Sequence, residues 1–423
     1  MKKIILILTL WMGLGVFRLY AETNNGMPAA DAGPMLPYDF SLCDKNVAWS
    51  DTLKPMFVSY TARHGARYLT GAGKFKKLFT ALTKAEKEDK ITENGKICLS
   101  YLKYIKEYSA GKWGLLSETG TKEEQRLGAD MAKMFPELMK EGSVISESTS
   151  VPRVVMTMYQ FMHALEIPNE KLEMTAASGN RFDSVLRCFG YVKEYEIFRT
   201  NKGKWTKYLP NIMEKNVSPE PARKLFSADF ITDDAELRNL TYDIYSALQG
   251  CNACGYSEPP VKFLTEKESY GCWVVNNFKH YMRNSINPVS DIAGRATTPL
   301  LRKIIDDMDC AALEAKDGKY PEIRMKGNFG HAETLLPLLS LMRIPGCYWY
   351  SKDYDKLEKE WKIQDVTPLA ANLMIVLLRG NSGEMYVSVR HNGVNVDPVP
   401  GKGKVLKWSE LKNYWLDLAS KYK

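Results

Sequence analysis

The sequence predicts an α/β fold that is interrupted by a helical insertion. Residues 57–62 and 143–148 are rich in β-forming side chains, and each segment leads through a polar turn into a helical pattern. Such alternation is typical of a sheet with helices packed on it. Between residues 180 and 290 the alternation stops, and helices, loops and many aromatic residues follow. Because strands return near the C-terminus, we expect an α/β domain in two parts around an inserted, mainly helical domain.

The N-terminus has the pattern of a secretory signal peptide. Lys2 and Lys3 precede a short apolar run, and cleavage is expected after Ala21. The run is too short to span a bilayer comfortably, and no later segment is long enough to do so. We therefore expect an exported protein, periplasmic or secreted, without a membrane span. Residues 1–21 also contain Arg18 but no acidic residue, so their removal lowers the formal charge from +8 to +5.

The first part of the α/β domain is expected at residues 22–179. It opens with an irregular segment containing several Gly and Pro residues, which leads to the first strand. A helix after the second strand begins at Pro152, because Pro is favoured in the first turn of a helix. The other expected elements are helices at about 74–90, 93–109 and 122–139 and a short strand at 172–176.

The inserted domain is expected at residues 180–290, and the second part of the α/β domain at 291–423. This second part begins with helices and ends with strands, so it completes the sheet. Its expected elements are a helix at 300–313, a short strand at 322–326, a buried helix at 334–342 and closing strands at 372–378 and 384–389.

Composition narrows the classes of partner. The 423 residues are 45% hydrophobic and 26% charged, which is ordinary for a globular protein. The chain has no block of Lys and Arg typical of a nucleic-acid-binding arm, so we expect no nucleic-acid partner. Eight Cys residues leave the disulfide pairing open. Cys251 and Cys254 form a CxxC without a second CxxC or a nearby His, so we expect no zinc site.

A basic turn follows the first strand. Arg63, His64, Gly65, Ala66 and Arg67 place two guanidinium groups around an imidazole, with a Gly that allows the backbone to turn. In an α/β sheet, ligands bind just beyond the carboxyl ends of strands, which is where this turn falls. Arg matches phosphate oxygens, and nearby positive charge favours a neutral, nucleophilic His. A surface turn whose His has no special role is the alternative interpretation.

A second candidate phosphate ligand follows the second strand. Arg153 lies in the first turn of the helix that begins at Pro152. The helix dipole and the guanidinium group both favour an anion at this position. An Arg on a solvated helix start is the alternative.

A third junction between strand and helix contains another His and a carboxylate. His331 and Glu333 follow the strand at 322–326 and precede the buried helix, which is the geometry expected for His64. A helix N-cap pair is the alternative interpretation. The other His residues are expected to be structural or exposed: His163 on a helix, His280, and His391 on a turn.

Three of these segments resemble enzymes that use a phosphohistidine. RHGARYLT, residues 63–70, resembles the RHGxRxP signature of the histidine acid phosphatases, with Leu69 where the family has Pro. The run LSETG…LGADMAKMFP, residues 116–136, resembles LTxxG…LGxxLrxxfP of the same enzymes. FGHAETLLPLLSLM, residues 329–342, resembles the multiple inositol polyphosphate phosphatases, which carry His-Ala-Glu where most relatives carry His-Asp. This last match extends through residues 370–373.

The resemblance implies a fold and a set of roles. The fold is a mixed, mostly parallel sheet flanked by helices, with the helical insertion capping the site. His64 attacks phosphorus, and Glu333 protonates the leaving oxygen. Neither a metal ion nor another cofactor is implied, because Arg side chains neutralise the phosphate. The implied phosphate ligands are Arg63, Arg67, Arg153 and His331.

Four further cations are candidates for the rim of the substrate site. Three of them, Lys74, Lys76 and Lys77, lie at the start of the helix expected at about 74–90, and a solvated helix face is the alternative for most of these lysines. Arg181 begins Arg-Phe-Asp, which resembles RFFDxC of inositol polyphosphate phosphatases with one Phe missing and the Cys displaced.

The function implied is a phosphomonoesterase. It hydrolyses inositol polyphosphates, especially inositol hexakisphosphate (phytate), through a phosphohistidine intermediate. A broad-specificity histidine acid phosphatase acting on sugar phosphates or other small phosphomonoesters is the alternative on the same scaffold. A catalytically silent phosphate-binding protein is a third hypothesis, which the presence of both His64 and Glu333 disfavours.

Overall fold

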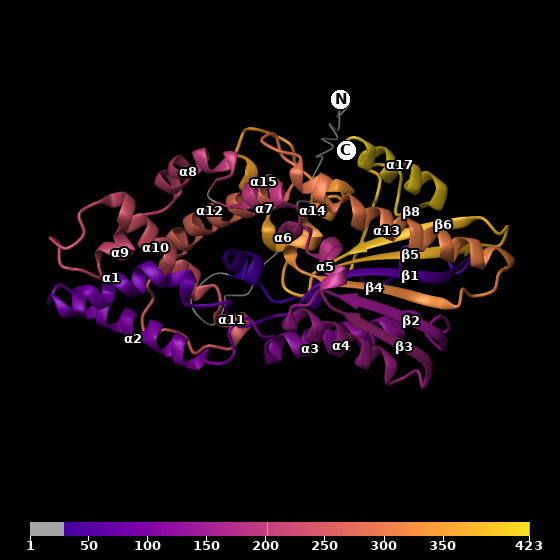
Figure 1. Cartoon of the computed structure of the whole chain (residues 1–423), viewed down its shortest axis with the longest axis horizontal. Coiled ribbons are helices and arrows are strands. Elements are labelled where there is room, and N and C mark those ends of the chain that lie inside the picture. Colours follow the sequence, from indigo (N-terminus) through magenta and orange to yellow (C-terminus); the bar gives the residue numbers. More distant parts are fainter. Residues whose placement is uncertain (1–28, 201, 423) are drawn as a thin grey trace, which may run out of the picture.

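In a computed structural model of the chain, residues 29–200 and 202–422 are described. They form a central sheet of eight strands in the order β3-β2-β4-β1-β5-β6-β7, with β8 paired to β6 (Figure 1). Strands β3, β2, β4 and β1 are parallel, and the pairs beyond β1 are antiparallel. The predicted mixed sheet is confirmed. The strands are Leu53–Arg63 (β1), Glu141–Ser148 (β2), Lys171–Ser178 (β3), Ile323–Gly330 (β4), Asn372–Gly380 (β5), Met385–His391 (β6), Val394–Val396 (β7) and Val405–Lys407 (β8).

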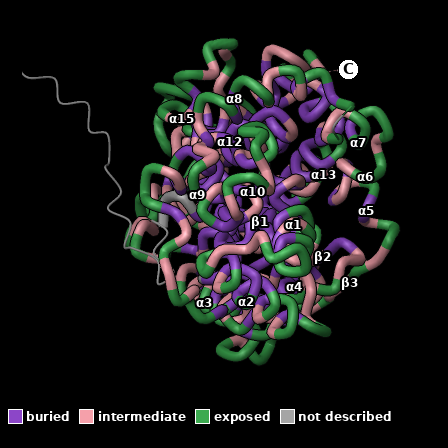
Figure 2. The backbone as a smooth tube through the Cα atoms, turned by 90° about the vertical axis from the view of Figure 1, so that its left-hand side faces the viewer, coloured by how far each residue is buried: buried purple, intermediate pink, exposed green. Residues whose placement is uncertain are grey.

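Helices cover both faces of this sheet. Alternate side chains of a strand point to opposite faces, so in β1 Val58 and Tyr60 enter one hydrophobic core and Phe57 enters the other. The core of Val58 contains side chains of α3 (Glu118–Met134) and α4 (Pro152–Glu166). Figure 2 shows the buried positions concentrated in the interior of the molecule. The core of Phe57 is shared with α13 (Ile292–Glu314), α14 (Ala332–Leu341) and α17 (Trp408–Ser420).

The other helices gather beside the sheet, toward the left of Figure 1. Two of them, α1 (Lys76–Lys87) and α2 (Glu93–Tyr108), precede residue 180, yet α1 packs on both α2 and α10. The limits of an inserted domain at 180 and 290 stay a prediction. The contacts show that helices α1 and α2, which precede residue 180, pack together with helices of residues 180–290. The helices of residues 180–284 are Asn180–Leu186 (α5), Cys188–Tyr191 (α6), Lys193–Arg199 (α7), Leu209–Asn216 (α8), Glu220–Arg223 (α9), Asp234–Leu248 (α10), Cys251–Cys254 (α11) and Glu266–Asn284 (α12).

Polar caps set where several helices begin. Ser117 Oγ accepts a hydrogen bond from the N–H of Gly120 (3.3 Å), so α3 begins at Glu118, earlier than the predicted start at residue 122. Thr265 and Glu268 form a capping box that begins α12. The opposite end of this helix, in its last turns, lies beside the site described below.

Some segments differ from the sequence-based expectations. Strand β4 continues to Gly330 rather than ending at residue 326, because Gly327 still pairs with both β1 and β2. His391 is the last residue of β6 and does not lie in a turn. The sequence analysis did not predict β7, β8 or α17. Helix α17 is held by an apolar face that includes the buried Trp415.

The predicted signal peptide, residues 1–21, lies outside the described residues. In residues 29–200 and 202–422, no helix is both long enough and apolar enough to cross a bilayer. The remaining short elements are Ala29–Met35 (η1), Phe40–Leu42 (η2), Ala72–Phe75 (η3), Lys204–Tyr208 (η4), Ala315–Asp317 (η5), Leu357–Glu360 (α15) and Ile363–Val366 (α16).

Candidate active site

The three predicted site segments meet because three parallel strands end side by side. Arg63 at the end of β1 lies opposite Gly330 at the end of β4, and Ser148 at the end of β2 lies opposite Phe329. The segments that follow carry His64 on one side and His331 on the other. Their ring centroids are 5.7 Å apart. The carboxyl ends of these strands are therefore the place where a ligand can meet all three segments.

Hydrogen bonds from several neighbouring segments fix the backbone of the turn after β1. The N–H of His64 donates to the carbonyl of Gly330 (3.0 Å), and the His64 carbonyl accepts from Ala370 (3.1 Å). The N–H of Gly65 donates to Thr157 Oγ1 (3.1 Å) on α4. The N–H of Ala66 donates to a buried carboxylate, Glu123 Oε2 (2.7 Å), on α3. A turn fixed in this way keeps its side chains in place without a ligand.

Gly65 is required by a close approach of two backbones. A Cβ at position 65 would lie 2.8 Å from the carbonyl oxygen of Gly120, and a Cβ at position 120 would lie 2.1 Å from that of Ala66. From the sequence, Gly65 was expected to allow the backbone to turn. The structure instead requires small residues on both sides of this contact, and it gives the LSETG glycine its role in positioning the turn.

His64 has the geometry of a nucleophile. Its Nδ1 lies 2.9 Å from the Gly65 carbonyl oxygen, so Nδ1–H donates there and the lone pair is on Nε2. The side chain is only 3% exposed. Burial lowers the pKa of His64 well below its usual range, and the charges of Arg153 and then Arg63 lower it further. The imidazole is therefore neutral at neutral pH and can attack phosphorus through Nε2.

The two Arg residues of the turn are held through one end of each guanidinium. Arg63 Nη1 donates to the carbonyls of Pro34 (2.7 Å) and Thr367 (2.6 Å), and Arg67 Nη1 donates to the carbonyl of Tyr68 (2.9 Å). Burial, and next the charge of Arg67, lowers the pKa of Arg63 to about 9. Arg63 therefore stays charged at neutral pH. In the described part of the chain, the buried Nε groups of Arg63 and Arg67 have no acceptor, so they are available to an anion.

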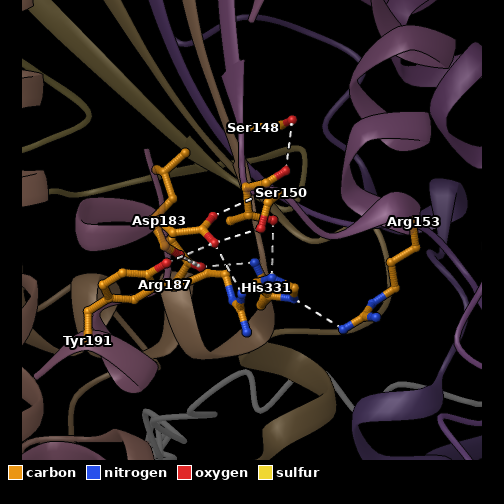
Figure 3. Close-up of polar contacts among 10 residues, drawn as sticks. Ser148, Ser150, Arg153, Asp183, Arg187, Tyr191 and His331 are labelled. Carbon is orange, nitrogen blue, oxygen red and sulfur yellow. Dashed lines mark hydrogen bonds and ion pairs between the residues drawn. The ribbon is translucent and has the colours of Figure 1, made fainter. Parts of the chain in front are cut away.

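Arg153 and His331 are in contact, as Figure 3 shows. Arg153 Nη2 lies 3.3 Å from His331 Nδ1, and His331 Nε2 lies 3.3 Å from Thr149 Oγ1. Since the guanidinium donates to Nδ1, the His331 proton is on Nε2. Burial and then the charge of Arg153 lower the pKa of His331 to about 3. His331 is thus a neutral hydrogen-bond donor, and it sits at the N-cap position of α14 as the alternative interpretation also required.

A buried carboxylate ties the start of the insertion to this site (Figure 3). Asp183 on α5 accepts from the Ser150 N–H (2.9 Å) and the Ser150 hydroxyl (2.7 Å), and it pairs with Arg187 Nη1 (3.1 Å). The positive charge of Arg187 contributes to lowering the pKa of both Arg153 and His331. Asp183 thus fixes the loop before Arg153 and brings an additional cation to the site.

Glu333 lies in the first turn of α14 and is paired with a residue of the insertion. Its Oε1 accepts from Arg199 Nη2 at 3.0 Å. Burial alone would raise the pKa of Glu333, but Arg199 and then His331 outweigh it and hold the pKa well below the usual range. In this arrangement Glu333 is an ionised carboxylate. Its negative charge opposes the lowering of the pKa of Arg63, Arg67 and Arg153 across the site.

More cations face Glu333 from the helical side. Burial and then the charges of Arg67 and Arg283 lower the pKa of Lys74, which is the predicted rim lysine. Burial lowers the pKa of Arg283 on α12. The charge of Arg199 lowers this pKa further, whereas Tyr242 and Glu333 oppose the change. Lys279, one turn earlier, has its pKa lowered to about 7 by burial, Arg283 and Lys74. These cations therefore repel one another electrostatically, which is expected of a site that binds a polyanion.

His280 lies in the same region, and the structural role expected for it stays a prediction. Burial lowers its pKa to about 3, Glu333 opposes this change, and Arg283 adds to it. The other two expectations hold, because His163 is exposed on α4 and His391 Nε2 bonds the carbonyl of Val366 (2.8 Å).

Three of the predicted rim cations lie elsewhere or stay untested. Lys76 and Lys77 line a separate groove of about 880 Å³ with Lys84 and Phe230, outside the cluster around Glu333. Arg181 is exposed on α5, with its guanidinium 4.5 Å from the ring centroid of Phe182. Its role in substrate binding stays a prediction.

The cations that α7 and α12 contribute were not among the predicted site residues. Arg199 and Glu333 are 134 positions apart in the chain, and neither Arg199 nor Arg283 lies in a recognisable motif. Only Arg187 had a nearby signal, because it follows the Arg-Phe-Asp segment by one helical turn. In residues 29–200 and 202–422, three or more His, Cys, Asp or Glu side chains do not gather where they could hold a metal ion.

Comparison with known proteins identifies the family. Residues 56–392 match the family described as "Histidine phosphatase superfamily (branch 2)", which is more than half of the chain. The chain belongs to this superfamily. The matched range begins in the strand before His64 and includes Arg153, His331 and Glu333. The predicted family is therefore confirmed.

Individual histidine phosphatases resemble the chain over most of its length. It is 22% identical over 386 residues to multiple inositol polyphosphate phosphatase 1 of Gallus gallus, covering 86% of this chain and 82% of that protein. The structure of the multiple inositol polyphosphate phosphatase of Bifidobacterium longum, in complex with inositol hexasulfate, has a TM-score of 0.73 at 14% identity, covering 93% and 98% of the two chains. A phytase from D. castellii has a TM-score of 0.67 at 15% identity, covering 93% of this chain and 85% of its own. These structures share the fold.

Proposed function

We propose that this histidine phosphatase hydrolyses inositol polyphosphates, inositol hexakisphosphate in particular, through a phosphohistidine at His64. The number of cations around His64 and Glu333 carries the proposal, because one phosphate group needs fewer of them. The names of the relatives, which are inositol polyphosphate phosphatases and a phytase, support the same substrate class. The cations left for further phosphate groups are Lys74, Arg187, Arg199, Lys279 and Arg283.

In the first step, His64 Nε2 attacks phosphorus in line with the leaving oxygen. The new N–P bond forms as the bond from phosphorus to the inositol oxygen breaks, and Glu333 in its acid form donates a proton to that oxygen. The Nδ1–H bond to Gly65 supports this step, because it keeps the ring oriented and stabilises the charge that develops on the imidazole. The products are phosphohistidine and an inositol phosphate with one phosphate group fewer.

In the second step, water attacks the phosphohistidine. Glu333, now a carboxylate, accepts the proton of that water, the P–N bond breaks, and inorganic phosphate leaves. Arg63, Arg67 and Arg153 stabilise the charge on the non-bridging oxygens in both steps, and the Nε2–H of His331 is a further donor. The buried Nε groups of the three Arg residues support this assignment, because they have no acceptor of their own in the described part of the chain.

Phosphate release from a panel of substrates tests the proposal. The panel contains inositol hexakisphosphate, glucose 6-phosphate and glycerol 2-phosphate at equal concentration, with His64→Ala and His163→Ala as matched variants. The expected result is fastest release from inositol hexakisphosphate, loss of all turnover in His64→Ala, and full turnover in His163→Ala. Faster release from the monophosphates would instead support the broad-specificity phosphatase.

We also propose that the mature protein is exported to the periplasm or secreted, on the basis of the charged and apolar N-terminal pattern alone. Expression of the full chain followed by N-terminal sequencing of the processed protein tests this. A first residue of Glu22 is expected, and an uncleaved Met1 would contradict the proposal.

A further inference from the structure

Arg199 joins the insertion to the general acid. Its Nη2 donates to Glu333 Oε1 at 3.0 Å, and its Nε donates to Asn284 Oδ1 at 3.0 Å. The guanidinium lies 4.9 Å from the ring centroid of Phe189. The side chains of Arg199 and Glu333 are 20% and 29% exposed, so a ligand can reach both. This contact is therefore both well oriented and accessible.

The contact conflicts with the chemistry expected of Glu333. A general acid must carry its proton when the leaving oxygen departs. An Arg that donates to the carboxylate favours the ionised form and so opposes the uptake of that proton. The free enzyme consequently holds Glu333 in the form that suits the second step but not the first.

A substrate with a second phosphate group resolves the conflict. A phosphate dianion offers an Arg fork more negative charge than a carboxylate does. Lys74 and Arg283 lie in the same region, so they draw a second phosphate toward Arg199. Once Arg199 has moved to that phosphate, Glu333 loses its partner and faces a dianion, and both changes favour uptake of a proton.

We propose that Arg199 is a positioning and specificity-determining residue, which holds the Glu333 carboxylate in the free enzyme and releases it when a second phosphate group of the substrate takes its place. The proposal rests on the phosphatase function above and adds a reason why polyphosphates are preferred. A monophosphate leaves Arg199 on Glu333, so its hydrolysis is slowed by the missing proton.

Other groups around Glu333 also act on its charge. The expected pH effect is therefore a comparison between variants, in which these neighbours are constant. They are His331 on its own helix, His280 and Arg283 from α12, Lys74 from η3, and Arg63, Arg67 and Arg153 beside His64.

The test uses Arg199→Gln and three substrates. Glycerol 2-phosphate has one phosphate and an alkoxide leaving group, p-nitrophenyl phosphate has one phosphate and a leaving group that needs no proton, and inositol hexakisphosphate has several phosphates. Without Arg199, kcat for glycerol 2-phosphate is expected to rise by about tenfold near pH 7, and its decline at high pH should move to higher pH. The kcat for p-nitrophenyl phosphate should stay within about twofold. The KM for inositol hexakisphosphate should rise by about tenfold, because one charged contact is lost.

Two further variants separate this role from a structural one. Arg295→Gln is the matched control, because Arg295 pairs with Glu194 of the same helix α7 but at an exposed site (3.9 Å). It is expected to behave as the wild type. Arg199→Lys keeps the charge without the fork, so it should restore most of the wild-type pH profile for glycerol 2-phosphate. Thermal unfolding of each variant shows whether α7 is still in place.

An equal fall in kcat for all three substrates would overturn the proposal, and so would an unchanged pH profile for glycerol 2-phosphate. Failure of the proposed function has a different signature, namely a wild-type enzyme that hydrolyses the monophosphates but not inositol hexakisphosphate. In that case the pH profiles of the two monophosphates still report whether Arg199 controls Glu333.

Discussion

Gly120→Ala is expected to damage catalysis more than it damages stability. The new Cβ would lie 2.1 Å from the carbonyl oxygen of Ala66 and 2.6 Å from its nitrogen, whereas real Cβ contacts are essentially never shorter than 3.0 Å. The turn and helix α3 must therefore separate by about 1 Å. Because Ala66 N–H also donates to Glu123 of α3, the separation stretches the bond that holds the turn.

The expected losses of stability and of catalytic rate in Gly120→Ala can be estimated from the residues that must move. Overpacking of this kind costs about 1–3 kcal/mol of stability. A displacement of about 1 Å in a group that positions the reacting atoms costs about 10²-fold in rate. His64 and Arg67 flank the displaced residues, so we expect kcat/KM for inositol hexakisphosphate to fall by about 10²-fold in protein that is still folded at 25 °C.

The control is a second glycine on the same helix. A Cβ at Gly128 would lie 2.1 Å from the carbonyl oxygen of Phe161 on α4, which is the same clash against a different partner. Thermal unfolding and steady-state kinetics are measured for Gly120→Ala and Gly128→Ala. Similar falls in Tm with a much larger fall in kcat/KM for Gly120→Ala are expected. Equal losses of activity in both variants would refute the reasoning, as would full activity in Gly120→Ala.

Four other results are expected. Glu333→Gln should slow release of the first phosphate from inositol hexakisphosphate by about 10²-fold, and acid-quenched wild type given labelled substrate should carry phosphate on His64. Dialysis against EDTA should leave activity intact, because Arg side chains neutralise the phosphate; restoration of a dialysed, inactive enzyme by Mg²⁺ alone would contradict this. Burial raises the pKa of Glu123 to about 7, against the opposing effect of its backbone N–H bonds. Its contribution to stability is therefore present below about pH 4.3 and is lost as pH rises through 7, on the order of 3 kcal/mol. Urea titrations at pH 5 and 8 should show a smaller fall in Glu123→Gln than in the wild type.

The strands and the positions of the candidate phosphate-transfer residues could be predicted because local sequence determines both. A run of β-forming residues that ends in a polar turn defines a strand end, and parallel strands align their carboxyl ends. His64, Arg153 and His331 each follow such an end, so three local patterns implied one site. The same reasoning placed His391 wrongly in a turn, because strand β6 continues through pairing with β5 and β7, which the local sequence does not show.

The role of Gly65 shows a different limit. A glycine after a strand is an ordinary signal for a turn, and that was the predicted reason for it. The actual constraint is the carbonyl of Gly120 at 2.8 Å from its missing Cβ. The two glycines are both in segments that resemble the family, but sequence alone does not reveal that they touch. Close backbone contacts between distant segments need the fold before they can be recognised.

The cations of the insertion could not be predicted, and the reason bears on how the enzyme selects its substrate. The transfer residues are fixed by strand ends, so their positions in sequence are constrained and form motifs. Arg199 and Arg283 reach Glu333 through long side chains from helices, and many backbone positions would allow that reach. Selection for a polyanion therefore needs cations in the right volume rather than at fixed sequence positions. In this chain, Arg199 of α7 joins these helical cations to Glu333, which follows the end of strand β4.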